Sequence, residues 1–339
     1  MILFAKSGLQ NRACRNCGFA LAYKPMLLNS AKLLRLVALW AFSIVLLAMC
    51  GGCSSLLYYP SKDPFTDPVR FRHHPTDVEF TTSDGVHLHG WYFKSPTRPA
   101  KATVLYFHGN AQNLTTHFYG MYWALDQGVD YFIFDYRGFG LSDGSPSPEG
   151  TVKDGHAALD WINQHKDPVT KLILFGQSLG GAVALRVACE SNASTDYDKI
   201  IIDSGFMSYR KVAQKVLASH WVTWPIQWLG WLVMSDAVAP EDCMSRISPH
   251  PLLVVHGLDD QTVPFAMGEQ IYTAALPPKE FWQIEGGRHT DFLFRENLRF
   301  QKMLLDWIVS GPKANEKIER FTPVPSLSSD RSASTAIAK

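Results

Sequence analysis

The chain has no excess of charge of either sign. Its 339 residues include 32 Lys and Arg against 31 Asp and Glu, which gives a formal net charge of +1. It also has no run of basic residues, so it lacks the electrostatic footprint of a nucleic-acid-binding protein. We therefore predict no nucleic-acid partner.

Signatures of cofactors and metals are equally scarce. The sequence has no internal repeat and no glycine-rich phosphate loop, and it holds only six cysteines. Cys14 and Cys17 have the C-x-x-C spacing of a metal-binding cysteine pair, but the sequence has no second such pair. The sequence thus predicts neither a metal nor a cofactor, and its length allows one α/β domain of about 230 residues with extensions.

A serine in a G-x-S-x-G motif is the first candidate for chemistry. The motif is Gly176-Gln177-Ser178-Leu179-Gly180, which follows an apolar run at residues 171–175 and precedes small and apolar residues. A strand that turns sharply into a helix exposes such a serine, and the flanking glycines leave the room that the turn requires. We predict that Ser178 is a nucleophile.

A serine hydroxyl needs a base, and the base needs a third group that orients it. After a nucleophile elbow, these partners are expected behind later strands. The predicted strand at 280–285 is followed by His289, which we predict to be the base. The polar loop after the predicted strand at 251–256 holds Asp259 and Asp260, and the residue pattern alone leaves open which one meets the imidazole.

Acyl transfer also requires two N–H donors for the developing oxyanion. One should be the backbone N–H of Leu179, directly after the nucleophile. The other should come from the loop after the predicted strand at 102–107, and we assign it to Asn110. Two further histidines, His108 and His256, are expected to hold the neighbouring loops rather than to react.

Three motifs carry a resemblance to a known family. They are YFHGNA at 106–111, DYRGFG at 135–140 and FGQSLGG at 175–181. Over about residues 75–310, the chain resembles the α/β-hydrolase superfamily and is similar to bacterial membrane-associated members akin to eukaryotic α/β-hydrolase-domain proteins 13 and 17. The resemblance implies a metal-free serine hydrolase of esters, thioesters or amides, with Asp260 of the H-G-x-x-D pattern as the acid.

Two other functions remain as alternatives. Members of this subgroup are commonly placed beside serine aminopeptidases, although the sequence shows no acidic pair positioned to hold a substrate amine. A catalytically silent envelope lipoprotein could also keep the fold. A haloalkane or epoxide hydrolase is excluded, because it needs a carboxylate where Ser178 stands.

The N-terminal region predicts a membrane anchor. An apolar stretch at 36–50 follows basic residues and precedes Gly-Gly-Cys, which is typical of an export signal with Cys53 as a lipidated residue. Ser54 after it favours the outer membrane of a bacterial envelope, facing the periplasm. If translation started at Met26, the basic region, the apolar core and the cysteine would have the usual lengths and spacing of such a signal. The alternative is an uncleaved helix over 36–59, long enough to cross ~30 Å of hydrocarbon.

Apolar runs alternate with helical stretches through the middle of the chain. The pattern predicts a mostly parallel twisted sheet with helices on both faces, the α/β-hydrolase fold, opened by a hairpin. The predicted strands lie at 76–80, 86–93, 102–107, 130–135, 171–176, 198–203, 251–256 and 280–285, and the clearest helices at 148–164 and 178–189.

The pattern also divides the chain into segments. These are an export or anchor segment at 1–53, a linker at 54–74, a catalytic domain at 75–311 and a disordered tail at 312–339. Cys189 and Cys243 could form a disulfide in an oxidising compartment, or each could be a small buried side chain. The oligomeric state is not determined by the sequence.

An insert at 206–246 interrupts the alternation and should form a helical cap. It holds four tryptophans at helical spacing, Trp221, Trp224, Trp228 and Trp231. They could pack the cap onto the core, or they could line an acyl pocket or touch lipid, because indole rings suit all of these settings.

Overall fold

The computed structural model describes residues 58–68, 71–191, 196–219 and 221–323, with residues 32, 35 and 37–40. The chain divides into two compact units, Met1–Cys50 and Gly51–Lys339. In the first unit the described residues are helical. Met26, Cys53 and most of the predicted export segment lie outside the described residues. Within the described part of the chain, no helix is long and apolar enough to cross a membrane.

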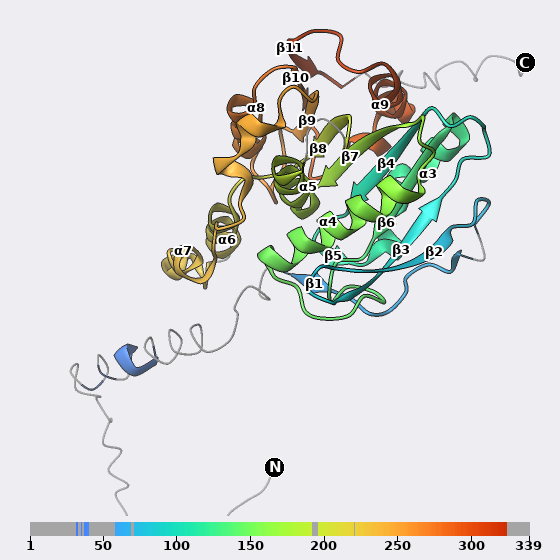
Figure 1. Ribbon diagram of the computed structural model, residues 1–339. Coiled ribbons are helices and arrows are strands. Elements are labelled where there is room, and N and C mark those ends of the chain that lie inside the picture. Colours follow the sequence, from blue (N-terminus) through green and yellow to red (C-terminus); the bar gives the residue numbers. More distant parts are fainter. Residues whose placement is uncertain are drawn as a thin grey trace, which may run out of the picture. The chain divides into compact units, whose positions relative to one another are not determined.

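In the second unit, nine of the described strands form one sheet (Figure 1). Their order across the sheet is β11-β10-β9-β8-β7-β4-β6-β3-β2. β3 runs antiparallel to both β2 and β6, and every other neighbouring pair is parallel, as the sequence predicted. The strands are β2 Thr76–Thr81, β3 His87–Phe93, β4 Ala102–Phe107, β6 Val129–Phe134, β7 Lys171–Gln177, β8 Lys199–Asp203, β9 Leu252–Gly257, β10 Lys279–Ile284 and β11 Glu316–Phe321.

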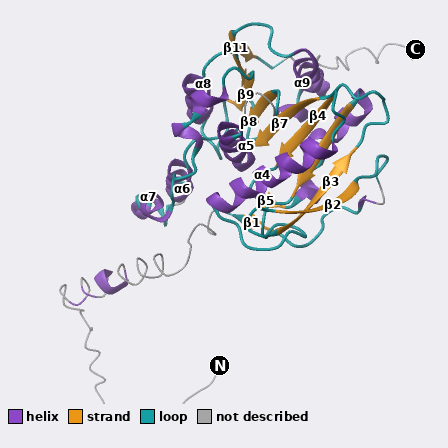
Figure 2. Cartoon of the chain, in the orientation of Figure 1, coloured by secondary structure: helices purple, strands orange, loops and turns teal. Residues whose placement is uncertain are grey.

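Helices cover both faces of this sheet (Figure 2). Successive side chains of a strand point to opposite faces, so a strand buried on both sides is apolar throughout. In β4, Leu105 and Phe107 join the hydrophobic cluster under α4, α5 and α8, whereas Val104 and Tyr106 join the cluster under α2, α3 and α9. These helices are α2 Leu114–His117, α3 Tyr119–Tyr122, α4 Pro148–His165, α5 Leu179–Glu190, α8 Phe265–Ala274 and α9 Arg299–Ser310.

The last strand corrects the predicted disordered tail. Residues 316–321 form β11, which pairs in parallel with β10. Phe321 is buried and meets the rings of Trp282 and Phe300 edge-on. The Lys and Glu content suggested disorder, but Glu-Lys-Ile-Glu-Arg-Phe places charges along an exposed sheet edge, where they discourage pairing with other chains. Residues 324–339 lie outside the described residues.

The segment predicted as a linker also belongs to the folded domain in part. The short strand β1, Tyr59–Pro60, pairs in parallel with β5, Ala111–Gln112. Tyr58 is only 4% exposed, and its ring packs edge-on against Phe139. The linker prediction is therefore wrong at these residues, because an aromatic side chain here is buried in the core.

The cap contains two helices, α6 Tyr209–Ala218 and α7 Leu229–Val233, which project from the body of the domain (Figure 1). They pack closely at Gly230, where a Cβ would lie 2.8 Å from the backbone nitrogen of Gln214. The four cap tryptophans take little part in this packing, because they are 54% to 89% exposed. The interpretation that they pack the cap onto the core is wrong.

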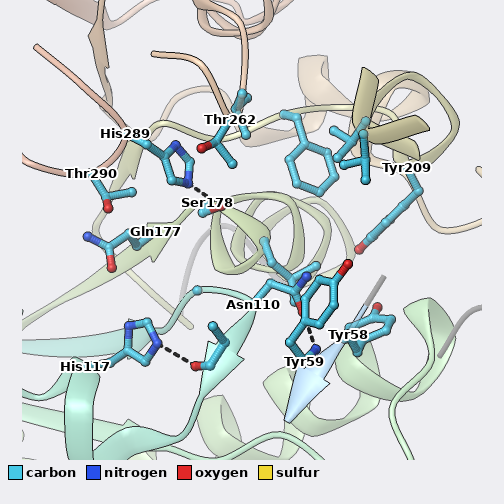
Figure 3. A pocket seen from close by; sticks show the side chains of 17 residues that line it. Tyr58, Tyr59, Asn110, His117, Gln177, Ser178, Tyr209, Thr262, His289 and Thr290 are labelled. Atoms are coloured by element: carbon cyan, nitrogen blue, oxygen red, sulfur yellow. Dashed lines mark hydrogen bonds between the residues drawn. The ribbon is translucent and has the colours of Figure 1, made fainter. Parts of the chain in front are cut away.

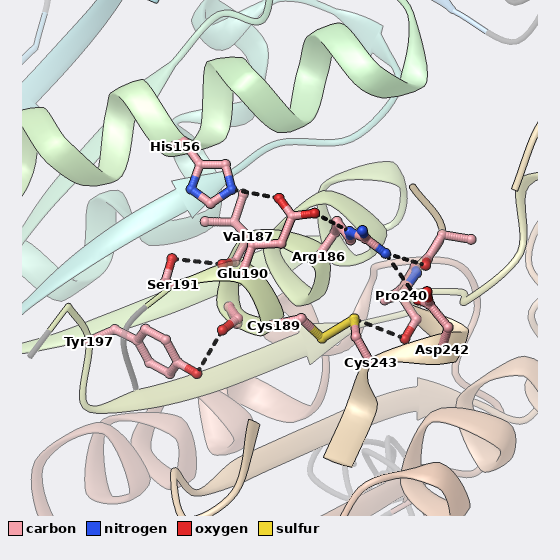
Figure 4. The surroundings of a disulfide bond; sticks show 12 residues. His156, Arg186, Val187, Cys189, Glu190, Ser191, Tyr197, Pro240, Asp242 and Cys243 are labelled. Carbon is pink, nitrogen blue, oxygen red and sulfur yellow. Dashed lines mark hydrogen bonds and ion pairs between the residues drawn. A yellow bond between two sulfur atoms is a disulfide. The ribbon is translucent and has the colours of Figure 1, made fainter. Parts of the chain in front are cut away.

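A disulfide joins Cys189, near the end of α5, to Cys243 at the base of the cap (Figure 4). Both cysteines are buried. Beside them, the Arg186 guanidinium donates to the carboxylate of Asp242 at 3.0 Å and to the carbonyl of Ala239 at 3.2 Å. These contacts fasten the end of the cap to the helix that begins directly after Ser178.

Candidate active site

Ser178 lies in the sharp turn between β7 and α5. Its φ of +55° is rare for a residue with a side chain, and such strain persists only where the surroundings enforce it. A Cβ on Gly176 would overlap the carbonyl of Gly180, and a Cβ on Gly180 would overlap the carbonyl of Phe107. The two glycines of the motif are therefore required by close backbone approach, as the sequence predicted.

His289 lies between Ser178 and Asp260 (Figure 3 shows the side toward Ser178). Its Nε2 is 2.9 Å from the Oγ of Ser178, and its Nδ1 is 2.7 Å from Oδ2 of Asp260. The structure thus brings together the three residues that the sequence named as nucleophile, base and acid. They come from three loops at the carboxyl ends of β7, β9 and β10, the edge where parallel sheets form their sites.

Two loops are joined so that Asp260 faces the imidazole. The backbone N–H of Asp259 donates to the carbonyl of Gly287, which links the acid loop to the loop that bears His289. Oδ1 of Asp260 accepts from the N–H groups of Thr262 and Val263 at 2.8 and 2.9 Å. Asp260 is buried and Asp259 is exposed, which resolves the choice that the residue pattern left open.

Hydrogen bonding keeps the Asp260 carboxyl ionised. Burial by itself would raise its pKa, but hydrogen bonds from His256 and His289 outweigh burial, and the pKa lies well below its usual range. The ring of His256 also braces the acid loop, because its Nε2 is 2.9 Å from the carbonyl oxygen of Val263. The bracing role predicted for His256 is confirmed for this nitrogen.

The two expected oxyanion donors lie beside the serine. Asn110 and Leu179 line the same pocket as Ser178. Leu179 is the first residue of α5, so the helix itself does not use its N–H. The Asn110 side chain accepts a hydrogen bond from the backbone N–H of Tyr59, which ties β1 to the donor loop. Beneath the loop, burial holds the pKa of His108 well below its usual range, so this ring is neutral.

A second carboxylate, which the sequence analysis missed, lies under the elbow. Oδ2 of Asp203, at the end of β8, accepts from Nε2 of Gln177 at 3.1 Å, and its Oδ1 accepts from the Ser204 hydroxyl. Its backbone carbonyl accepts from the N–H of Ser178. Burial raises the pKa of Asp203 to about 6, against the hydrogen bond from Gln177 and the attraction of His289. The sequence could have identified Asp203 as a site residue from its position at the carboxyl end of a predicted parallel strand.

A cavity of about 310 Å³ opens beside the Ser178 hydroxyl. Its walls come from β1, the donor loop, α6 and the loops that carry the acid and the base (Figure 3). Among the described residues that line it there is no Asp or Glu. The apolar part of the lining comprises Tyr58, Tyr59, Leu179, Phe206, Tyr209, Val212, Val216 and Val263. Such a pocket suits an apolar group rather than a cation.

Comparison with known proteins shows which family the chain is related to. A family model described as "Serine aminopeptidase, S33" matches residues 98–250. The uncharacterized protein YfhR of Escherichia coli is 33% identical over 264 residues, which cover 76% of this chain and 87% of that protein. The α/β-hydrolase domain-containing protein WAV2 of Arabidopsis thaliana is 30% identical over 253 residues, covering 70% of this chain and 80% of that protein. Among solved structures, an esterase of Pyrococcus furiosus aligns with a TM-score of 0.60 and 21% identity, over 74% of this chain and 97% of that one.

Proposed function

Because the chain belongs to the α/β-hydrolase family, we propose that it is a serine hydrolase that cleaves a carboxylic ester, thioester or amide through an acyl-enzyme. One observation carries the proposal. The imidazole of His289 is within hydrogen-bond distance of both the Ser178 hydroxyl and the Asp260 carboxylate. This arrangement supports Ser178 as nucleophile, His289 as base and Asp260 as the orienting group, the roles that serine hydrolases use.

In the first half of the reaction, Oγ of Ser178 attacks the substrate carbonyl carbon while Nε2 of His289 takes the hydroxyl proton. The negative charge moves to the carbonyl oxygen, where the N–H groups of Leu179 and Asn110 stabilise it; each such donor typically contributes on the order of 3 kcal/mol. His289 then gives its proton to the departing alcohol, thiol or amine. Asp260 remains ionised and stabilises the imidazolium.

In the second half, water attacks the acyl group on Ser178. His289 accepts a proton from this water, and the tetrahedral intermediate forms at the same two donors. When it collapses, the bond to Oγ breaks and the proton returns from His289 to Ser178. The products are a carboxylic acid and the regenerated enzyme.

The pocket favours an acyl substrate over the N-terminus of a peptide. An aminopeptidase must bind the positively charged amine of its substrate, and a buried cation requires a partner of opposite charge. No acidic side chain lines the described part of the pocket, whereas aromatic and aliphatic side chains do. We therefore assign the pocket to an apolar acyl chain.

Labelling with a fluorophosphonate probe, followed by assay on p-nitrophenyl esters of increasing acyl length, tests the proposal. The wild-type chain should be labelled and should hydrolyse the esters, and Ser178→Ala should do neither. Peptide amides assayed in parallel separate an esterase from a peptidase. A folded wild-type chain that resists the probe and leaves every ester intact would instead be a silent protein that keeps the fold.

We also propose that the enzyme is held at a bacterial cell envelope through its N-terminal segment, with lipid on Cys53 or an uncleaved apolar helix as the anchor. The support is the apolar stretch at 36–50 followed by Gly-Gly-Cys. Metabolic labelling with a fatty-acid analogue should mark the wild-type protein but not Cys53→Ser. Membrane-bound protein without label would favour the helix.

A further inference from the structure

The cap presents an exposed apolar surface next to the pocket. We call it the cap patch. Each of its side chains is more than half exposed, and Trp221 is 89% exposed. The patch consists of Trp221, Val222, Trp224, Trp228, Trp231 and Leu232. Soluble proteins rarely leave so many large apolar side chains together in water, so the patch indicates a binding surface.

The charged residues within the cap helices are basic, and two carboxylates flank them: Asp236 accepts from the backbone N–H of Arg210, and Glu241 pairs with Lys211 at 3.1 Å. The 27 residues from Tyr209 to Ser235 contain three basic residues, Arg210, Lys211 and Lys215, and no acidic residue. The Arg210 guanidinium lies 4.6 Å from the centre of the Trp231 ring, so a cation borders the patch directly. Indoles beside basic groups are typical of segments that lie in the interface of an anionic membrane.

The connection along the chain points to the same partner. The apolar stretch ends at Cys50, and Tyr58 in the pocket wall follows only eight residues later. Eight extended residues span at most about 28 Å, so an anchored chain keeps the pocket close to the bilayer. The same pocket is lined by Val212 and Val216 of α6, and the cap patch begins three residues after α6 ends.

We propose that the cap patch docks on an anionic phospholipid bilayer and that the substrate is an acylated lipid that enters the pocket from that bilayer. This inference rests on the proposed serine hydrolase and on its N-terminal anchor. Tryptophans seated at the headgroup level would place α6, and with it the pocket, at the depth where acyl esters lie. The lipid would then leave the bilayer along α6 without crossing water.

Quenching of tryptophan fluorescence by brominated acyl chains tests the docking step. The full-length Trp40→Phe chain, free of the tryptophan in the apolar stretch, is reconstituted into phosphatidylcholine and phosphatidylglycerol vesicles. A blank carries Phe at all four cap tryptophans as well. Docking predicts about twofold more quenching in the chain with cap tryptophans than in the blank, and less in phosphatidylcholine alone.

Equal quenching of the two chains would overturn the docking step. It would mean that the patch contacts water or a second copy of the chain instead of the bilayer. Equal quenching in vesicles with and without phosphatidylglycerol would overturn its dependence on anionic lipid. Because this measurement needs no catalysis, it stands even if the proposed chemistry fails.

The second measurement compares substrates. Trp221→Ala combined with Trp224→Ala should lower hydrolysis of a long-chain ester carried in vesicles about tenfold while leaving a soluble short-chain ester unchanged. Trp221→Ala alone, at the most exposed position, serves if the double variant misfolds. The matched control is Val169→Ala with Leu276→Ala, exposed apolar residues that precede β7 and β10.

The control should hydrolyse both esters at the wild-type rate. Equal loss on both esters in the cap variants, or no loss on either, would overturn entry from the bilayer. A wild-type chain inactive on the soluble ester would count against the serine hydrolase itself, and the quenching result would then decide the docking alone.

Discussion

The Asp203 carboxylate accepts a hydrogen bond from the side-chain amide of Gln177, the residue directly before the proposed nucleophile. The backbone carbonyl of Asp203 accepts in turn from the N–H of Ser178. One residue of β8 thus holds the turn at two points. It places a fully buried carboxyl group beneath a site where an imidazolium forms, and His289 already acts on the pKa of that group.

Asp203→Asn should change how stability depends on pH. The pKa of Asp203 is raised from 3.8 to about 6, so between these values the folded chain binds more protons than the unfolded chain. The folded wild type therefore loses stability as pH rises through this window, by up to about 3 kcal/mol from this group. The unfolding free energy of Asp203→Asn relative to wild type should rise between pH 4 and 7, measured by urea titration at each pH.

The same substitution should cost activity. Removing a negative charge near His289 weakens the stabilisation of its imidazolium, and we expect kcat to fall about tenfold at pH 7, or ~1.4 kcal/mol. Asp259→Asn is the control, because that carboxylate is exposed, and it should alter neither stability nor kcat. A more active Asp203→Asn enzyme would contradict the role assigned to this charge.

Asp260→Asn should preserve the fold but abolish most catalysis. The carboxylate accepts from His289 at 2.7 Å, and an amide in its place can leave the ring in the wrong tautomer. We expect kcat on a soluble ester to fall by a factor of about 10³ to 10⁴.

The variant should also lose stability that the wild type has above pH 4. The pKa of Asp260 is depressed in the fold, so the stability from this group is present above its unfolded pKa and disappears as pH falls. Kinetics and unfolding curves of the same preparation separate the two effects. Wild-type kcat in a folded variant would exclude Asp260 as the orienting acid.

Gly180→Ala and Gly181→Ala should differ sharply although they are neighbours. A Cβ on Gly180 would overlap the carbonyl group of Phe107, and backbone there cannot move aside. We expect a loss of about 3 kcal/mol of stability and loss of fluorophosphonate labelling. A Cβ on Gly181 would lie 3.0 Å from the Cα of Gly205, so a small shift accommodates it and labelling should persist. Equal labelling of the two variants would contradict this account of the elbow.

Replacing Cys189 and Cys243 by Ala should weaken the fold more than the site. The bond closes a loop of 54 residues that contains the whole cap, and its loss should lower the unfolding free energy by about 2 to 4 kcal/mol. Urea unfolding without reductant measures the difference, and reductant should bring the wild type to the level of the variant. A wild type insensitive to reductant, with a midpoint equal to that of the variant, would contradict a stabilising disulfide.

The sequence by itself determined most of the sheet and indicated the residues that we propose to act. Apolar runs separated by helical stretches located the strands of the large sheet from β2 to β10 to within a residue or two, whereas the short strand β5 was not predicted. The motif around Ser178 and the position of His289 after a strand end named two of the side chains that the structure brings together, and the resemblance to the family chose Asp260 over Asp259 as the third. Such features are local, because strand periodicity and turn conformation depend on residues that are neighbours in the sequence.

Contacts between distant segments were decided only by the tertiary structure. The sequence does not distinguish Asp203 from other carboxylates at strand ends, and only the fold brings it into contact with Gln177. Residues 316–321 form a strand because they pair with the edge of β10. The burial of Tyr58 and the exposure of the cap tryptophans were equally beyond the sequence. Burial in any apolar environment stabilises an aromatic side chain, so the residue type favours burial without fixing it, and only the packing of the whole chain decides which aromatic residues are buried.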